Sequence, residues 1–288
     1  MFQEKRVGIV VVHWRNIKDT LECLDSINKI NYHNYKVILV NNDTENFPLG
    51  PSEMIEIINN GENLGFIKAC NQGLKKAIEQ KADYILSLNN DTVVDKNFLK
   101  ALVAFCEENP KTIVSPVIYT YQSDKVENMG GRLIYWLGIC QLIREEQLMP
   151  PDYLSGACFL AKAVYFSDIG YLDESYIFYF DDLDWSIRAR AKGYLLRIVH
   201  ESRIWHKHSA STRVKNGWGP EKAYYIARNT FTFGDKHFKG IKKWWWFLGY
   251  TLIGVNLQFL FFCRNSGSFK KQILGIRNGL SYVLRRGY

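Results

Sequence analysis

The chain has 288 residues, which is enough for one or two domains with a sizeable buried core. Hydrophobic residues make up 47% of it and charged residues 23%, and these globular proportions exclude a disordered tail, a collagen-like fibre or a coiled coil as the whole structure. The 6 cysteines are scattered without a CxxC pair, so neither a zinc cluster nor a disulfide framework is indicated, and a reducing, cytoplasmic compartment fits best. No secretion signal is expected, because no small-residue cleavage site follows the first apolar run.

The net charge of +8 conceals a strong asymmetry along the chain. Residues 1–200 carry 21 Lys and Arg against 26 Asp and Glu, whereas residues 201–288 carry 16 against 3 and have a net charge of +13. A basic segment of this kind is typical of binding to nucleic acid or to an anionic membrane surface. The neighbouring sequence must decide between these two partners.

Short β-branched runs alternate with amphipathic stretches over the first 120 residues or so. Strands are predicted at 6–14, 36–43, 54–60, 84–91 and 112–119, and helices at 19–30, 66–80 and 95–110, the last opening on a cap at Asp95. Such alternation predicts an α/β fold with a mostly parallel sheet and helices on its faces. Ligands then gather at the carboxyl ends of the strands.

The remainder of the chain has a different pattern. Residues 123–166 are expected to form hairpins that extend the same sheet, and a helix is expected to begin at Asp181 or Asp182. Two short apolar runs follow at 195–199 and 203–205, and the last third is helical and basic.

Polar clusters stand where the predicted sheet ends, at 41–43, at 89–91 and at 181–184. Asn and Asp make turns after strands, which is one explanation of these clusters. A carboxylate at such a place also suits Mg²⁺ or Mn²⁺ bound to a diphosphate, because both cations prefer oxygen ligands. Position alone does not separate the two explanations.

Seven motifs, taken in their order along the chain, indicate which family the chain resembles. They are VVVHWRN (10–16), VILVNND (37–43), NLGFIKACNQGL (63–74), LNNDTVVD (88–95), SGACFLAKA (155–163), LDESYIFYFDDLDWSIRARAKGY (172–194) and WHKHSAST (205–212). Together they resemble family 2 glycosyltransferases of GT-A fold, close to the rhamnosyltransferase-like members that build bacterial surface polysaccharides. The resemblance implies inverting transfer of a sugar, with rhamnose as a candidate, from a dTDP- or UDP-linked donor to a polysaccharide or polyprenyl-linked glycan.

The resemblance also implies a donor site. The residues that it assigns to nucleotide binding are Val12, Asn16, Asn41, Asn63, Gly65, Asn71, Asn90 and Asp91. Asn41 stands where the family usually has an Asp that contacts the pyrimidine, so the identity of the base stays open. For the segment from Asn63 to Asn71 a capped turn is the alternative, with Gly65 supplying a conformation that other residues avoid.

A metal site is implied at Asp91 and His206. The cluster at 89–91 keeps only the last Asp of the family's DxD-type element, so Asp91 alone is expected to reach the Mg²⁺ or Mn²⁺ ion or the ribose. His206 stands where relatives offer a histidine to that ion. His208 is a weaker candidate that would share the same face of a strand. A metal-independent enzyme is the alternative.

Asp182 matches the family's catalytic carboxylate, which acts as general base on the acceptor hydroxyl. An Asp at a helix start also caps free N–H groups, which is the structural alternative. Asp181 and Asp182 raise each other's pKa when confined, and this favours a base. The residues expected at the acceptor or diphosphate are Asp181, Asp184, Trp185 and Arg228; the alternatives are an ion pair of Asp184 with Arg188 and a surface position for Arg228.

The segment 244–263 holds 20 residues without a charge, with apolar side chains at helical spacing and basic residues on both sides. A helix lying in the membrane interface is favoured, and a spanning helix or one buried against the domain or a second copy of the chain are the alternatives. We therefore expect a glycosyltransferase domain at 1–235 and a basic membrane-associating extension at 236–288, located at the inner face of the cell membrane, with no nucleic-acid partner.

Two rival functions are weighed against transfer. A nucleotidyltransferase would need a Gly-rich, Lys-bearing loop after the first strand, and the segment WRNIKDT (14–20) lacks it. A non-catalytic, membrane-associated module that binds a nucleotide or sugar is the other rival, because the element at 89–91 has lost part of its acidic pattern.

Overall fold

The computed structural model describes residues 4–50, 52–207, 219–261 and 266–286. Contacts divide the chain into two compact units. The first comprises Met1–Gly131, Leu142–Ser175 and Asp181–Lys207, and the second Arg132–Gln141, Tyr176–Phe180 and His208–Tyr288. The functional boundary predicted at residue 235 stays a prediction.

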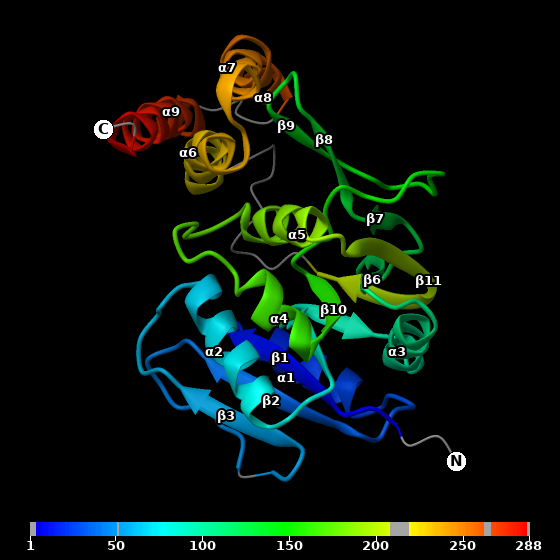
Figure 1. Cartoon of the computed structure of the whole chain (residues 1–288). Helices are drawn as coiled ribbons and strands as arrows, with labels where there is room; N and C mark the ends of the chain where they lie inside the picture. Colours follow the sequence, from blue (N-terminus) through cyan, green and yellow to red (C-terminus); the bar gives the residue numbers. More distant parts are fainter. Residues whose placement is uncertain (1–3, 51, 208–218, 262–265, 287–288) are drawn as a thin grey trace. The chain divides into compact units, whose positions relative to one another are not determined.

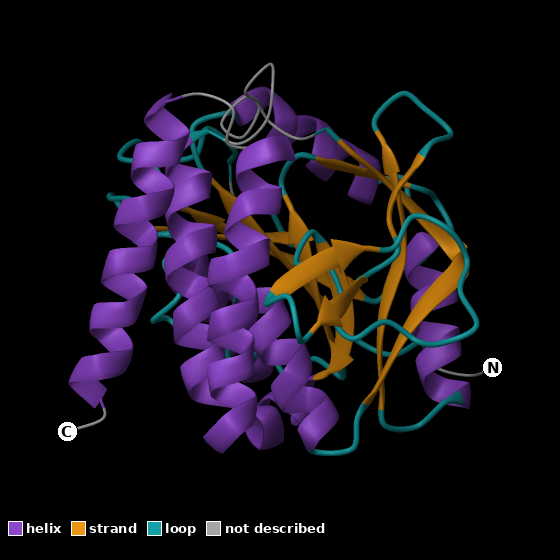
Figure 2. Ribbon diagram, turned by 90° about the horizontal axis from the view of Figure 1, so that it is seen from above, coloured by secondary structure: helices purple, strands orange, loops and turns teal. Residues whose placement is uncertain are grey.

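The first unit is built on a mixed sheet with the order β3-β2-β1-β4-β10-β6-β11-β5, to which β7 adds beside β6 (Figure 1, and the orange strands of Figure 2). Strands β3, β2, β1 and β4 pair with one another in parallel, and so do β6 and β11. Strand β10 is antiparallel to β4 and β6, β5 is antiparallel to β11, and β7 is antiparallel to β6. The predicted α/β class with a mostly parallel sheet is confirmed. The strands are β1 Val7–His13, β2 Tyr35–Asn41, β3 Ile55–Asn59, β4 Tyr84–Asn89, β5 Thr92–Val94, β6 Thr112–Thr120, β7 Val126–Asn128, β10 Cys158–Lys162 and β11 Leu195–His206.

Helices cover both faces of this sheet because alternate residues of a strand point to opposite sides. Ile9 and Val11 of β1 belong to the same apolar core as residues of α1 and α3. Gly8 lies on the other face, where a Cβ would come within 2.7 Å of the Ala77 Cβ of α2, so α2 packs closely on β1. The helices of this unit are α1 Ile17–Ile27, α2 Phe66–Glu79, α3 Phe98–Glu108, α4 Ala163–Ile169 and α5 Asp181–Ala191.

Two local predictions need correction, and two apolar runs prove to be a single strand. The helix expected from Asp95 begins at Phe98, because the Asp95 carboxylate instead accepts the Asn97 N–H at 2.8 Å in a preceding turn. The runs 195–199 and 203–205 form one strand, β11, which stays paired with β6 across a bulge between Val199 and Arg203. Of the hairpin region, β7 and β10 join the main sheet, but β8 (Gly131–Ile134) and β9 (Ile139–Leu142) form a two-stranded sheet of their own.

The second unit is mainly helical, as predicted for the end of the chain. α6 (Pro220–His237) packs along α9 (Ser266–Arg286), and α7 (Gly240–Gly249) continues through a π-helical turn, η1 (Tyr250–Gly254), into α8 (Val255–Phe261). Glycines at 275 and 279 let α9 approach the backbone of α6, since a Cβ at Gly279 would lie 2.8 Å from the Arg228 carbonyl oxygen. Among the described helices, none is long and apolar enough to cross a membrane.

Candidate active site

The carboxyl ends of the parallel strands lie in register and form a polar edge of the sheet. In the register, Asn41 at the end of β2 lies beside His13 of β1 and Asn59 of β3, and Asn89 of β4 lies beside Val12. Val12 itself is 7% exposed. The structure therefore places two of the predicted nucleotide-binding residues, Val12 and Asn41, at one edge of the sheet.

Asn41 is completely buried and builds the turn after β2. Its amide group donates to the Glu45 carbonyl oxygen at 2.7 Å and to the Asn59 side-chain oxygen at 2.8 Å, and its own oxygen accepts the Asp43 N–H at 3.1 Å. Both amide hydrogens are thus engaged, one within the turn and one with the end of β3. A contact between Asn41 and the base stays a prediction.

A network of amide side chains holds the loop that leads into α2, and its Asn60 was missed from the sequence. Asn42 donates to the Asn63 side-chain oxygen at 2.8 Å, and its oxygen accepts from Leu64 N–H at 3.0 Å and from the Asn60 amide at 3.2 Å. Gly65 follows with a φ of 85°, which permits the turn into α2. α2 begins directly after this turn, and the first-turn N–H groups of a helix suit an anion such as a phosphate.

Asn71, on α2, ties this helix to the segment before α5. Its amide donates to the Leu172 carbonyl oxygen at 2.9 Å and to Glu174 Oε1 at 3.0 Å, and its oxygen accepts the Leu172 N–H at 3.1 Å. These contacts give Asn71 a positioning role, and its predicted contact with the nucleotide stays untested.

A buried chain of polar groups adjoins the end of β1. His13 is 3% exposed, and its Nδ1 lies 2.7 Å from the Thr20 hydroxyl, which also accepts from the Asn90 amide at 2.8 Å. Burial lowers the pKa of His13, so its neutral form is favoured. Asn16 is exposed at the start of α1 and donates to Asp19. His13 was not among the predicted site residues. The signal that could have pointed to it is a histidine at the end of an otherwise apolar strand.

The two predicted metal ligands meet in the structure. β11 pairs with β5 so that His206 lies beside Thr92, and its Nε2 is 3.2 Å from Asp91 Oδ1. On the other side of the ring, Nδ1 is 3.0 Å from Glu127 Oε1 on β7. Burial alone lowers the pKa of His206, but the hydrogen bonds to the two carboxylates outweigh it and raise the pKa to about 9.

This arrangement fits a divalent cation in part. Asp91 and His206 offer one oxygen and one nitrogen ligand, and Glu127 would fix the ring of His206, as carboxylates do behind metal-bound histidines. Within the residues that the structure describes, no group of three or more His, Cys, Asp or Glu side chains is placed to hold a metal. Diphosphate oxygens and water would therefore complete the shell. His208 lies outside the described residues.

Asp182 stands in the first turn of α5, as predicted, and is held by two backbone N–H groups. Its Oδ2 accepts from Gly156 N–H at 2.9 Å and its Oδ1 from Leu183 N–H at 2.8 Å. Gly156 lies in the SGACFLAKA segment, and a Cβ there would come 3.3 Å from the Asp182 Cβ. The side chain of Asp182 keeps part of its surface exposed, whereas Asp181 is 7% exposed.

The carboxyl groups of Asp181 and Asp182 have raised pKa values. Burial is the main cause of the raised pKa of Asp181, about 8, and the charge of Asp182 adds to it. Burial also raises the pKa of Asp182, against the two backbone hydrogen bonds that lower it. The predicted effect of the neighbouring charge is confirmed for Asp181, with burial as the larger cause.

The chain enters α5 through an unusual backbone. Tyr179 and Phe180 have φ values of 63° and 70°, a region that side chains of this size rarely adopt. In the second unit, the fully buried Asn229 of α6 donates to the carbonyl oxygens of Phe178 at 2.8 Å and Tyr179 at 3.1 Å. Arg228 donates to the Asn229 side-chain oxygen at 2.9 Å, so the pair braces this segment. The predicted contact of Arg228 with diphosphate or acceptor stays untested.

Asp184 and Trp185 have structural contacts. Asp184 is 1% exposed and accepts from Arg188 Nε at 2.8 Å, so the ion pair considered from the sequence is present. Trp185 is 2% exposed, donates to the Gly170 carbonyl oxygen at 2.8 Å and stacks on Phe166 at 5.2 Å between ring centres. These contacts give no support to the predicted acceptor or diphosphate role of the two residues.

The model of the Glycosyl transferase family 2 matches residues 9–170, more than half of the chain. The chain belongs to this family. The match covers the sheet edge and Asp91 but ends before Asp182 and His206, so the proposed roles of those two residues rest on the motifs and the geometry.

Curated relatives of this family 2 glycosyltransferase differ in the sugars they transfer. A dTDP-rhamnosyl transferase from Shigella flexneri is 25% identical over 71% of this chain and 72% of its own length. A hexosyltransferase of low-salt glycan biosynthesis from Haloferax volcanii is 27% identical over 47% of this chain, and the match spans 46% of that relative, about half its length. An N-acetylglucosaminyl-diphospho-decaprenol L-rhamnosyltransferase from Mycobacterium tuberculosis is 30% identical over 35% of this chain and 33% of its own.

Solved structures agree on the fold. TarS 1-349 from S. aureus superimposes with a TM-score of 0.58 at 14% identity, covering 98% of this chain and 92% of TarS. GalNAc-T7, solved with UDP, GalNAc and Mn²⁺, gives a TM-score of 0.61 at 15% identity, covering 78% of this chain and 48% of GalNAc-T7. At these identities the likeness shows the GT-A fold alone.

Proposed function

We propose that this family 2 glycosyltransferase transfers a sugar, with rhamnose as the first candidate, with inversion, from a nucleoside-diphosphate donor to a glycan acceptor. The observation that carries the proposal is Asp182, a carboxylate with a raised pKa that is fixed by the N–H groups of Gly156 and Leu183. A general base works best when its pKa lies near the operating pH and its position is fixed. The family membership gives the reaction class.

In the proposed reaction, Asp182 takes the proton of an acceptor hydroxyl while that oxygen attacks the anomeric carbon of the donor. The bond from this carbon to the diphosphate oxygen breaks, its electron pair leaves with the nucleoside diphosphate, and the single displacement inverts the anomeric centre. A bound Mg²⁺ or Mn²⁺ ion would neutralise charge on the departing diphosphate. Asp91 and His206 are the residues we propose to hold it.

The donor base and the acceptor are proposed from relatives. The Shigella relative favours a dTDP-linked rhamnose, and the TarS complex with UDP-GlcNAc makes UDP the second candidate. The mycobacterial rhamnosyltransferase acts on a diphospho-decaprenol substrate, which favours a polyprenyl-linked acceptor. We propose that this protein would meet such an acceptor as a peripheral protein at the inner face of the membrane.

Melting shifts with dTDP, UDP and GDP, each with and without Mn²⁺, test the donor site. We expect one base to raise the melting temperature most, with a further rise on adding Mn²⁺. Release of the nucleoside diphosphate from the matching donor sugar, dependent on an acceptor glycan, tests transfer. A binding module would show the shift without release, and a nucleotidyltransferase would instead consume a nucleoside triphosphate and release pyrophosphate.

A further inference from the structure

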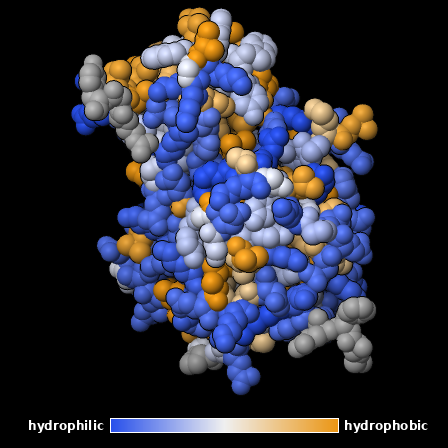
Figure 3. Space-filling model, in the orientation of Figure 1, coloured by the Kyte–Doolittle hydropathy of each residue, from blue (hydrophilic) through white to orange (hydrophobic). Residues whose placement is uncertain are grey.

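The last helices of the second unit expose many large apolar side chains. We call the run α7–η1–α8 (240–261) together with α9 (266–286) the helix platform. Trp244 is 62% exposed and Trp245 57%, and Leu252, Leu260 and Leu284 are each at least 60% exposed. The orange side chains at the top of Figure 3 lie over these helices. Monomeric proteins rarely expose an apolar surface of this extent without a partner.

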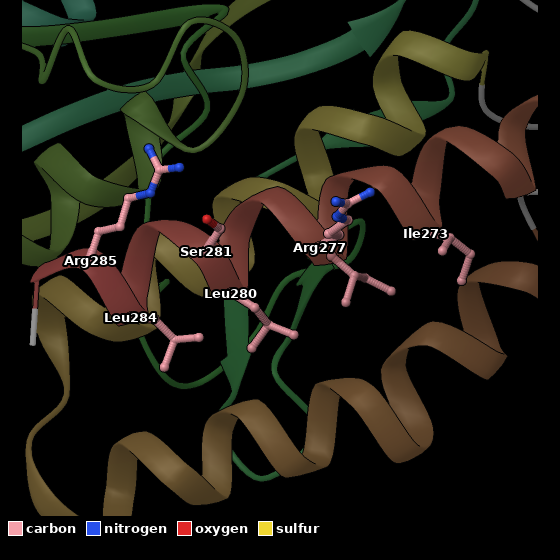
Figure 4. Close-up of a pocket in the computed structure, with 7 residues that line it drawn as sticks. Ile273, Arg277, Leu280, Ser281, Leu284 and Arg285 are labelled. Atoms are coloured by element: carbon pink, nitrogen blue, oxygen red, sulfur yellow. The ribbon is translucent and has the colours of Figure 1, made fainter.

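Two apolar hollows lie on the platform, one along α9 and one between α7 and α9. A groove of about 640 Å³ runs along α9 and is lined by Ile273, Ile276, Arg277, Leu280, Ser281, Leu284 and Arg285. Figure 4 shows Ile273, Leu280 and Leu284 on the same side of α9, facing the neighbouring helix, with Arg285 on the opposite side. A second hollow of about 480 Å³ is lined by Trp244, Trp245 and Leu248 of α7 and shares Leu280 with the first.

Charge decides which partner suits this surface. No Asp or Glu follows Asp235 in the sequence, whereas the platform carries exposed basic residues at Lys242, Lys270, Lys271 and Arg285. Two copies of the chain meeting through this face would bring like charges together. An anionic lipid surface instead complements the basic residues and offers hydrocarbon to the apolar ones.

We propose that the helix platform is the surface through which this protein binds an anionic phospholipid bilayer, with lipid chains entering the grooves beside Leu280. The sequence predicted a membrane-associating extension at 236–288 with the uncharged run 244–263 as its interfacial helix, and the structure shows that α9 also exposes apolar side chains. The apolar sides of both helices insert at the boundary between headgroups and acyl chains, and their basic residues contact the headgroups. The inference refines the peripheral location proposed above and is independent of the transfer reaction.

Sedimentation of the full-length protein with vesicles tests the proposal. The protein should bind vesicles that contain both phosphatidylcholine and phosphatidylglycerol. Its binding should be weak when the vesicles contain phosphatidylcholine alone, and it should weaken on the mixed vesicles at high salt. The double variant Leu280→Ser/Leu284→Ser should lose about tenfold or more in vesicle affinity, because each substitution removes apolar area from the inserted surface. Leu148→Ser is the matched control, since Leu148 is fully exposed but lies in the first unit. This variant should bind vesicles like the wild type.

Other outcomes would overturn the proposal. They are no binding of the wild type to phosphatidylglycerol vesicles at low salt, or unchanged binding of the double variant. A dimer in lipid-free sedimentation that the double variant dissociates would assign the surface to a second copy. Trp244→Ala/Trp245→Ala provides a second test on α7 should the α9 variant fail to fold. Nucleotide melting shifts, measured on the same samples, separate a failure here from a failure of the proposed transfer activity.

Discussion

Asp182→Asn removes the proposed base with little change in shape. The wild-type carboxylate accepts from Gly156 N–H at 2.9 Å and from Leu183 N–H at 2.8 Å. An asparagine retains one acceptor oxygen, so one of these hydrogen bonds is kept and the other N–H meets an amide NH₂ group. The substitution therefore abolishes proton acceptance and costs one hydrogen bond.

The expected effects on rate and stability differ in size. General base catalysis contributes about 10²- to 10⁴-fold, so turnover should fall by that factor, or about 3–5 kcal/mol of transition-state stabilisation. The lost hydrogen bond costs about 1 kcal/mol of unfolding free energy. Burial already disfavours the charged form of Asp182, as its raised pKa shows, so the neutral asparagine relieves part of that cost. The melting temperature should change little.

Initial rates of nucleoside diphosphate release at saturating donor and acceptor, together with calorimetric donor affinity, check this prediction. Donor affinity should stay within a few-fold, because the base acts on the acceptor. Asp168→Asn is the matched control, since Asp168 is an exposed carboxylate paired with Lys192 at 2.7 Å. Equal losses of donor binding and turnover would reassign Asp182 to the metal or diphosphate, and unchanged turnover would place the base elsewhere.

Three further predictions follow from the two units. The folded protein keeps a proton on Asp181 that the unfolded chain releases, so the contribution of Asp181 to the unfolding free energy should fall between pH 3.8 and about 8, by at most about 1.4 kcal/mol per pH unit. Urea titrations check this: the unfolding free energy of the wild type minus that of Asp181→Asn should decrease as the pH rises. Gly279→Leu should lower unfolding free energy by about 1–3 kcal/mol, since it forces α9 from α6, while Gly50→Leu, in open space, should not. Asn229→Ala should lower the melting temperature and the turnover while the nucleotide melting shift persists, because the carbonyl groups before α5 lose their donor; full turnover would contradict a positioning role.

Much of the fold could be predicted because its signals are local. The alternation of β-branched runs with amphipathic stretches predicted the parallel strands β1, β2, β3 and β4 and their helices. The sequence could not reveal that β10 inserts antiparallel between β4 and β6, because strand order depends on contacts between distant segments. The continuity of β11 was hidden for the same reason, since the bulge after Val199 is defined only by its pairing with β6.

The candidate site was predictable where a motif names the residue. Asp91, His206 and Asp182 were placed from motifs, and the structure brings the first two within 3.2 Å. Glu127 was missed, because it contacts His206 across 79 residues of sequence and lies in no motif. Asn41 shows the opposite case, since the motif suggested a ligand contact and the structure shows a side chain whose amide hydrogens are donated to Glu45 and Asn59.

Fixed hydrogen bonds in the first unit hold α2 and, separately, the proposed base. Asn71 of α2 holds Leu172 across 101 residues of sequence, and Gly156 holds Asp182 across 26. Both Asn71 and Gly156 lie within the segment that matches the family model, whereas Asp182 lies beyond it. The matched segment therefore provides one of the two N–H groups that hold the proposed base, that of Gly156, and Leu183 of α5 provides the other. Rigid attachment of this kind is what a displacement with a single base requires, since proximity and orientation of the reacting groups determine its rate.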